Sequence, residues 1–129
     1  MKVVLGIGCD RGTPLQTLED VIDQALNSIN LNRQAVQQLA TIDKKNDEQA
    51  ILQLAEIYQW PLSFYTAEQL AEIKVPSPSA VVLKYMGTPS VSEAAAILAA
   101  NTDMNNLLVE KFKHRGSDGK NATVSIVKL

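Results

Sequence analysis

Short apolar runs alternate with longer segments of mixed polarity over the first half of the chain. Three of these runs are almost continuously apolar and are followed by glycine or polar residues. Runs of this kind are typical of strands that are buried on both faces of a parallel sheet. We therefore predict strands over Lys2–Ile7, Leu39–Ile42 and Leu62–Tyr65.

The segments between and after these runs have apolar residues every three or four positions, which is the spacing of one helix face. In the first segment the pattern covers Leu15, Leu18, Ile22, Ala25, Leu26 and Ile29. We predict helices over Pro14–Ile29, Ala50–Tyr58, Thr66 to about Ile73, and Val91–Asn101.

Most of these helices begin with a capping signal. A Ser, Thr or Asn followed three residues later by Glu or Gln can satisfy the free N–H groups of the first helical turn. The pairs are Thr13 with Gln16, Asn46 with Gln49, Thr66 with Gln69, and Ser90 with Glu93. Pro14 suits the first position of its helix. Asn32 and Ser77 are two weaker start signals.

The C-terminal part has a different pattern. Two β-prone runs, Leu107–Lys113 and Ala122–Val127, flank a turn-forming sequence at 116–119, which predicts an antiparallel hairpin. Strands that alternate with helices predict an α/β fold in three layers, α/β/α, with a mainly parallel sheet. The length of 129 residues favours a single domain over residues 1–129.

Cysteine and histidine each occur once, as Cys9 and His114. An intrachain disulfide is therefore impossible, and a zinc cluster of Cys and His side chains is excluded. A reducing compartment is the simplest inference. No leader segment and no apolar run near the length of a membrane span is present. We expect a cytoplasmic protein without a metal site, a cofactor or membrane contact.

Charge is distributed unevenly along the chain. The net charge is −2, although residues 110–129 hold five basic side chains and only two acidic ones. Binding to nucleic acid needs a broad basic face that neutralises many phosphates. This pattern argues against a nucleic-acid partner and favours a small ligand that carries several negative charges.

Distinctive residues follow the first predicted strand, at the end where ligands bind in open parallel sheets. They are Gly6, Gly8, Cys9, Arg11, Gly12 and Thr13. Glycines let a ligand approach the main chain, helix N–H groups attract anions, and Arg11 can bind a carboxylate or phosphate. The alternative is a tight turn that needs glycine for its own geometry. Cys9 has no visible catalytic partner, so packing in the loop is its favoured role.

Asp43 and Lys44 follow the second predicted strand. They form either a solvated turn or part of a binding edge, because the carboxyl ends of parallel strands meet there. Asp43 is also a candidate general base or acid.

Lys111 and Lys113 alternate along a predicted strand, so both project from one face. Glu110, Phe112 and His114 are expected on the other face. The two lysines either reach the carboxylates of a ligand or protect an edge strand against aggregation.

Four segments that occur in order carry a resemblance to a known family. They are Gly6–Thr13, Thr41–Lys45, Pro76–Ser79 and Gly87–Ala96, and Lys111, Lys113 and Thr123–Val127 extend the match. Together they resemble the C-terminal domain of the cobalamin biosynthesis protein CbiG and its stand-alone relative CobE. The resemblance covers essentially the whole chain.

This resemblance implies an α/β domain that acts on the corrin pathway. CbiG is the cobalt-precorrin-5A hydrolase, which opens a ring-attached lactone and releases acetaldehyde. The expected partner is therefore an acidic tetrapyrrole intermediate, together with other cobalamin-biosynthesis enzymes or the N-terminal regions of CbiG. The resemblance adds Ser77 and Ser79 to the candidate ligand-binding residues. If the domain opens a lactone, we expect water to be activated by a carboxylate such as Asp43.

Two alternatives remain open on sequence alone. The first is a non-catalytic, CobE-like protein that carries a corrinoid. The second is a nucleotide-binding module, because Gly6, Gly8 and Gly12 lie between a predicted strand and a predicted helix. Their spacing departs from the G-x-G-x-x-G fingerprint of dinucleotide-binding proteins, which makes the second alternative the weaker one.

Overall fold

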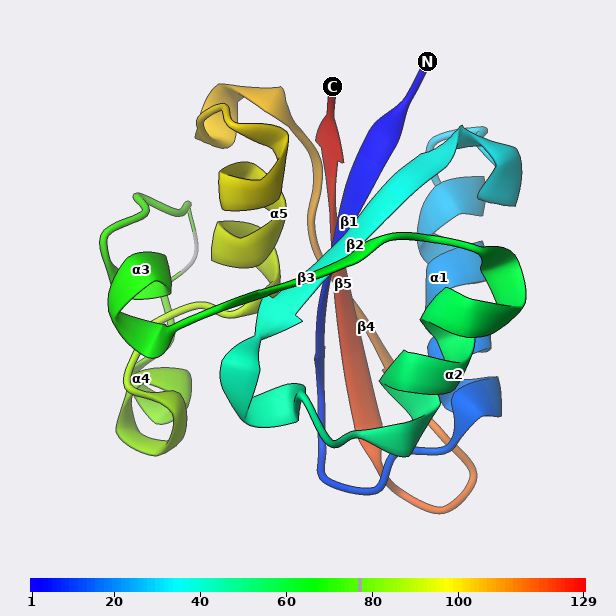
Figure 1. Ribbon diagram of the computed structural model, residues 1–129, viewed down its shortest axis with the longest axis horizontal. Helices are drawn as coiled ribbons and strands as arrows, with labels where there is room; N and C mark the ends of the chain where they lie inside the picture. Colours follow the sequence, from blue (N-terminus) through cyan, green and yellow to red (C-terminus); the bar gives the residue numbers. More distant parts are fainter. Residues whose placement is uncertain (77) are drawn as a thin grey trace.

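One mixed β-sheet forms the centre of the protein (Figure 1). The computed structural model describes residues 1–76 and 78–129, and the sheet is described for these residues. Its five strands, in spatial order, are β3 (Leu62–Tyr65), β2 (Val36–Ile42), β1 (Val3–Cys9), β5 (Asn121–Lys128) and β4 (Leu107–Arg115). Strands β1, β2 and β3 are parallel, and β5 runs antiparallel to both of its neighbours. The predicted parallel strands and the C-terminal hairpin are confirmed.

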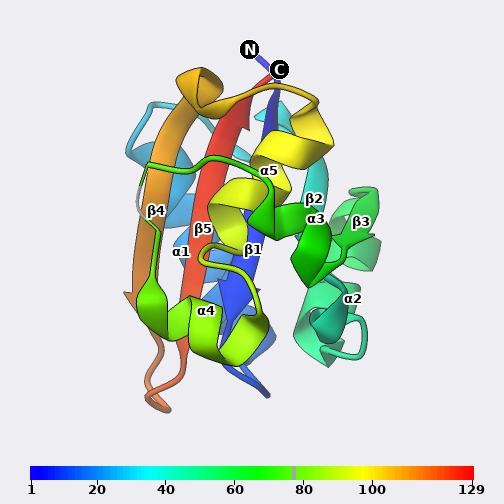
Figure 2. The ribbon, with the colours of Figure 1, turned by 90° about the vertical axis from the view of Figure 1, so that its left-hand side faces the viewer.

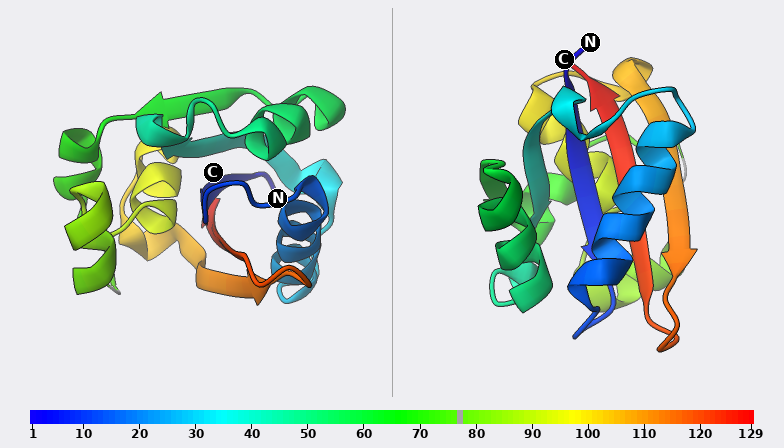
Figure 3. Two further views of the ribbon diagram at one scale, coloured as in Figure 1. Left: turned by 90° about the horizontal axis from the view of Figure 1, so that it is seen from below. Right: turned by 90° about the vertical axis from the view of Figure 1, so that its right-hand side faces the viewer.

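Helices cover both faces of this sheet, as the three-layer prediction requires (Figures 1 and 3). Helices α1 (Leu15–Asn27) and α2 (Gln49–Tyr58) lie on one face. Helices α3 (Ala67–Ala71), α4 (Ala80–Met86) and α5 (Ser92–Ala100) lie on the other. Short 3₁₀ helices, η1 (Arg33–Ala35), η2 (Asp43–Lys45) and η3 (Met104–Asn106), precede or follow strands.

The two covering layers pack on the sheet with side chains of different size. On the α1 face, large residues such as Leu18, Ile22 and Leu26 fill the core against β1 and β5. On the other face the alanines of α5 pack directly on β1. A Cβ atom at Gly6 would lie 1.8 Å from the carbonyl oxygen of Ser92, so only glycine fits there. This close contact fixes the N-terminus of α5 beside the carboxyl end of β1.

Several helix starts differ from the predicted ones. Pro14 is the N-cap of α1, because the Thr13 hydroxyl donates to the backbone oxygen of Asp10 at 2.7 Å and closes the turn instead. Glu48 is the N-cap of α2 where Asn46 was predicted, and Val91 is the N-cap of α5 where Ser90 was predicted.

Other start signals are confirmed. Thr66 and Gln69 form a complete capping box at α3, and Asn32 caps η1. The weak start at Ser77 lies outside the described residues. Helix α4 is capped by Ser79, which accepts a hydrogen bond from the backbone of Val82 at 3.2 Å. Among the described residues, the helices are too short or too polar to cross a bilayer.

Candidate functional site

A hollow of about 600 Å³ opens at the carboxyl end of β1, and we call it the lysine pocket. It lies between helix α4, the N-terminus of α5 and the hairpin strands β4 and β5, which Figure 2 shows side by side. Its polar wall includes Gly8, Cys9, Ser79, Lys111 and Lys113. An adjoining, more open hollow of about 650 Å³ shares Ser79 and both lysines. The two hollows therefore form one continuous concave surface around the lysines.

The opposite wall of the lysine pocket is apolar and comes from α4. Val81, Val82, Tyr85 and Met86 line it. Val81 and Tyr85 are 66% and 69% exposed, and none of the residues of α4 is buried. A short helix thus holds large apolar side chains in contact with solvent, in a pocket that two lysines also line. This combination suits a ligand that has an apolar body and negatively charged substituents.

Strand β4 positions the lysines as predicted, with one exception. Lys111 and Lys113 both line the pocket, whereas Phe112 packs against the core on the α1 side. His114 lies 3.9 Å from Asp20 of α1, also on that side. Glu110 differs from the prediction, because it lines the adjoining hollow together with the lysines. The pairing of β4 with β5 is irregular between Val109 and Phe112, and such an irregularity changes which face a side chain points to.

The alternative role for these lysines is compatible with the structure as well. Strand β4 is an edge strand of the sheet. Charged side chains on an edge strand discourage pairing with another chain. One pair of lysines can therefore protect the edge and bind a ligand.

A buried carboxylate lies next to the lysine pocket. Glu93, in the first turn of α5, is 0% exposed, and its Oε1 lies 3.5 Å from the Nζ of Lys111. The Ser90 hydroxyl donates to the same oxygen at 3.3 Å, while Oε2 has no hydrogen-bond partner among the described residues. Burial raises the pKa of Glu93, and the nearby Lys111 ammonium lowers it by less. The sequence signalled this residue only as half of a capping box.

Cys9 is half-buried in the wall of the pocket. Burial raises the pKa of its thiol, and the opposing effect of the Lys45 ammonium is smaller. The thiol is therefore protonated at neutral pH, which makes it a poor nucleophile. Its environment supports the packing role that the sequence favoured.

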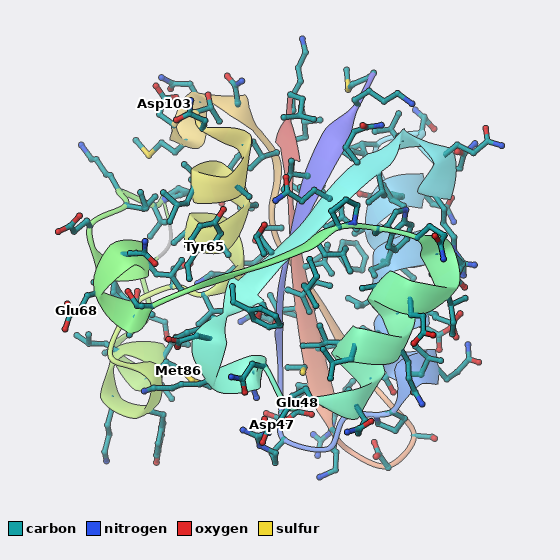
Figure 4. The ribbon with its side chains drawn as sticks, in the orientation of Figure 1. Asp47, Glu48, Tyr65, Glu68, Met86 and Asp103 are labelled. Carbon is teal, nitrogen blue, oxygen red and sulfur yellow. The ribbon has the colours of Figure 1, made fainter. Side chains whose placement is uncertain are left out.

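The first loop forms a separate hollow of about 430 Å³, lined by Arg11, Gly12 and Thr13 and by residues of α2. Arg11 contacts two of the protein's own carboxylates, with Nη1 at 2.6 Å from Asp47 and 2.9 Å from Oε1 of Glu48. The N–H of Gly12 donates to Oε2 of Glu48 at 3.2 Å. Figure 4 shows Asp47 and Glu48 beside each other below α2. A protein carboxylate thus occupies the place where the sequence predicted an external anion.

The negative charge on Oε1 of Glu48 is balanced by nearby cations and not by hydrogen bonds. Its Oε1 lies within ion-pair distance of Arg11 and 3.8 Å from the buried Lys45 ammonium, yet neither contact has hydrogen-bond geometry. The hydrogen bond from Arg11 lowers the pKa of Asp47. Arg11 therefore connects the loop after β1 to the loop after β2.

Lys44 and Asp43 lie outside the residues that line these three hollows. The Lys44 ammonium donates to the backbone oxygen of Met86 at 3.1 Å and connects η2 to α4. Asp10, which does line the lysine pocket, accepts hydrogen bonds from the backbone and side-chain amides of Asn121 at 2.8 and 3.2 Å. A catalytic role for Asp43 stays a prediction.

The predicted site residues therefore divide into groups. The lysine pocket combines Gly8, Cys9, Ser79, Lys111 and Lys113, and the Arg11 hollow combines Arg11, Gly12 and Thr13. Gly6 lies beneath α5, and Ser77 lies outside the described residues. Sequence reasoning missed the apolar wall of α4, whose only signal was the spacing of Val81 and Tyr85. Among the described residues, no group of three or more His, Cys, Asp or Glu side chains could hold a metal ion.

Comparison with known proteins identifies relatives that act in one biosynthetic pathway. The family described as Cobalamin synthesis G C-terminus matches residues 3–127. Cobalt-precorrin-5A hydrolase from Priestia megaterium is 36% identical over 109 residues, which are 84% of this chain and 29% of the hydrolase. Protein CobE from a Sinorhizobium species is 33% identical over 112 residues, which are 85% of this chain and 72% of CobE.

A solved structure agrees with these sequence matches. The crystal structure of CobE, a protein from the cobalamin (vitamin B12) biosynthetic pathway, has a TM-score of 0.83 and 32% sequence identity, and the match covers 99% of this chain and 90% of that chain. The chain spans less than a third of the hydrolase and most of CobE. It is a cobalamin-biosynthesis domain, related to cobalt-precorrin-5A hydrolase and to CobE, and it belongs to the Cobalamin synthesis G C-terminus family.

Proposed function

We propose that this domain binds an acidic corrin-ring intermediate in the lysine pocket. One observation carries the proposal: the pocket is lined both by apolar residues of α4 and by Lys111 and Lys113. Corrin precursors have a large ring with acetate and propionate substituents. The ring can pack on Tyr85 and Val81 while the substituents bind the lysines through charge-assisted hydrogen bonds.

The size of the hollow also suits such a ligand. Binding pockets for small molecules and cofactors usually have volumes of roughly 300 to 1,000 Å³. The lysine pocket has about 600 Å³ and continues into the adjoining hollow through the shared lysines. A ligand with substituents around a ring can use both.

Binding without catalysis is the role that the geometry favours for this domain alone. Asp43, the candidate general base, does not line the pocket, and the carboxylate of Asp10, which does line it, is engaged by Asn121. Lactone opening needs a base positioned to activate water. The domain also spans only 29% of the Priestia hydrolase, so residues outside this family region can supply the chemistry there.

A titration with cobyrinic acid, a corrin polycarboxylate, tests the proposal. Lys113→Ala removes a charge-assisted hydrogen bond, so we expect the Kd to rise about tenfold. Arg11→Ala is the matched control, because it removes a cation that lines the separate hollow of the first loop and already contacts Asp47 and Glu48. We expect that variant to stay within about twofold of the wild-type Kd. An unchanged Kd in Lys113→Ala, or a larger effect of Arg11→Ala, would contradict the assignment of the pocket.

The same titration separates this function from the nucleotide-binding alternative. The glycine loop faces the carboxylates of Asp47 and Glu48, which repel phosphate groups. We expect no binding of ATP or NAD under conditions in which cobyrinic acid binds. Tight binding of either nucleotide would favour the alternative.

A further inference from the structure

Glu93 lies directly behind the lysine pocket in an unusual environment. Its neighbours Ser90, Val91 and Ser92 line the pocket, while Glu93 itself is 0% exposed. Oε1 contacts Lys111 and Ser90, and Oε2 has no hydrogen-bond partner among the described residues. Burial of an ionised carboxylate with an unpaired oxygen is costly, so such a group responds readily to changes in nearby charge.

Lys111 connects this carboxylate to the pocket. Its ammonium lies 3.5 Å from Glu93, and its side chain retains 17% exposure on the wall of both hollows. A ligand carboxylate that binds Lys111 brings a second negative charge to the same ammonium. Like charges at short range disfavour ionisation, and the buried carboxylate has less access to compensating water than the ligand.

The other charged groups near Glu93 carry both signs, and Lys113 of β4 lines the same pocket as Lys111. Glu110, also on β4, raises the pKa of Glu93, although burial is the largest cause of that rise. Strands β1, β2, β3 and β5, which surround or pack against α5, contain no Asp, Glu or His. Glu68 on α3 and Glu72, which follows α3, are exposed, and α4 contributes Lys84 and the exposed Tyr85.

We propose that Glu93 takes up a proton from solvent when a ligand carboxylate binds Lys111. The ammonium of Lys111 stays protonated and forms an ion pair with the ligand carboxylate in place of Glu93. The neutral Glu93 carboxyl stays buried. Glu93 is then a positioning residue that makes binding of an acidic corrin tighter at lower pH. This inference rests on the proposed function of the lysine pocket.

Isothermal titration calorimetry with cobyrinic acid measures the proton directly. Titrations at about pH 7 in buffers of different ionisation enthalpy give the number of protons taken up per ligand bound. We expect uptake of up to about one proton for the wild-type protein, because the ligand carboxylates, with pKa values near 4 to 5, are already ionised. The Kd should rise by up to about tenfold per pH unit between roughly pH 6 and 8, as linkage requires for one proton.

Two variants distinguish proton uptake by Glu93 from the general effect of removing one negative charge. Glu93→Gln imitates the neutral acid, so we expect almost no proton uptake and a Kd that is independent of pH in this range. Glu72→Gln makes the same change in charge at an exposed residue outside the pocket and should keep the wild-type uptake. In wild-type protein with ¹³C-labelled glutamate carboxyl groups, the Glu93 signal should move to its protonated position on addition of ligand, which requires no variant.

Two failures have different meanings. Absence of cobyrinic acid binding to the wild-type protein refutes the proposed function and this inference with it. Binding without proton uptake, or equal uptake in wild type and Glu93→Gln, refutes the role of Glu93 and leaves the binding function intact.

Discussion

Two buried carboxylates flank the carboxyl end of β1, and they differ in how their charge is compensated. Glu48 has Arg11 and Lys45 nearby and accepts the N–H of Gly12. Glu93 has Lys111 and the Ser90 hydroxyl on one oxygen. The better compensated carboxylate connects two loops, whereas the poorly compensated one is the group that we propose takes up a proton.

The stability of the protein should reflect the raised pKa of Glu93. A carboxyl whose pKa is higher in the folded state than in the unfolded state contributes stability below its unfolded pKa, and that contribution is lost as pH rises through the folded pKa. Glu93→Gln has no charge to bury. We therefore expect it to exceed the wild type in free energy of unfolding by about 1 kcal/mol at about pH 8, and to match it near pH 4, in urea denaturation. An equal difference at both pH values would contradict this explanation.

At the scale of elements, the contact between α5 and β1 determines where the lysine pocket lies. The small side chains of Ala94, Ala95 and Ala96 let the helix approach β1, and Gly6 receives the backbone of Ser92. The N-terminus of α5 therefore reaches the end of β1, where Gly8 and Cys9 begin the pocket wall.

Gly6→Ala should disrupt this contact. Its Cβ would lie 1.8 Å from the carbonyl oxygen of Ser92, so the helix or the strand must shift. We expect a loss of about 3 kcal/mol in the free energy of unfolding, measured by urea denaturation. Gly8→Ala is the matched control on the same strand, because its Cβ would lie 4.0 Å from the side chain of Val91, an ordinary van der Waals contact. A loss above about 1 kcal/mol there would show that glycine is needed along β1 for another reason.

Helix α4 is the element whose exposure points to a ligand. Tyr85 is 69% exposed, so Tyr85→Ala should change the free energy of unfolding by less than about 0.5 kcal/mol. Loss of its apolar contact should raise the Kd for cobyrinic acid about tenfold. Ile57→Ala, at a 56% exposed residue of α2 on the opposite face of the sheet, is the control and should leave the Kd unchanged. Equal effects of the two substitutions would argue against α4 as a pocket wall.

At the scale of the whole molecule, the chain corresponds to most of CobE and to less than a third of the Priestia hydrolase. A fold that matches nearly the full length of a solved CobE chain is consistent with a binding role that needs no further domain. Under the proposed function, the chain binds the corrin intermediate, and lactone hydrolysis needs regions of the hydrolase that this chain does not match.

An assay of acetaldehyde release from cobalt-precorrin-5A tests this division of roles. We expect the chain alone to bind the substrate and to release no acetaldehyde above the uncatalysed rate, because Asp10, the carboxylate among the described residues that lines the lysine pocket, is engaged by Asn121. Release at a catalytic rate would show that the domain is an enzyme. In that case a loss of about a hundredfold in Asp43→Asn would support the predicted role of Asp43.

Much of the architecture followed from local sequence patterns. Strand β3 begins and ends where the apolar run predicted, and β1, β2, α1 and α2 were located correctly within a few residues. The spacing of apolar residues indicates which face of a helix or strand is buried, and this spacing can be read within one segment of the sequence. The capping box of Thr66 and Gln69 formed for the same reason, since both groups belong to one helical turn. Thr13 and Ser90 instead bonded to Asp10 and Glu93, because a hydroxyl has several acceptors within reach.

The sequence by itself therefore determined the three-layer α/β arrangement, the hairpin, the family and the supply of cations at the strand ends. Tertiary structure alone decided which charges meet: Arg11 contacts Asp47 and Glu48, which lie 36 and 37 positions later in the chain, while Lys111 contacts Glu93. It also exposed α4 opposite the lysines and buried Glu93. The physical reason is that ion pairing and desolvation depend on distances between remote segments, and those distances arise only when the helices pack on the sheet.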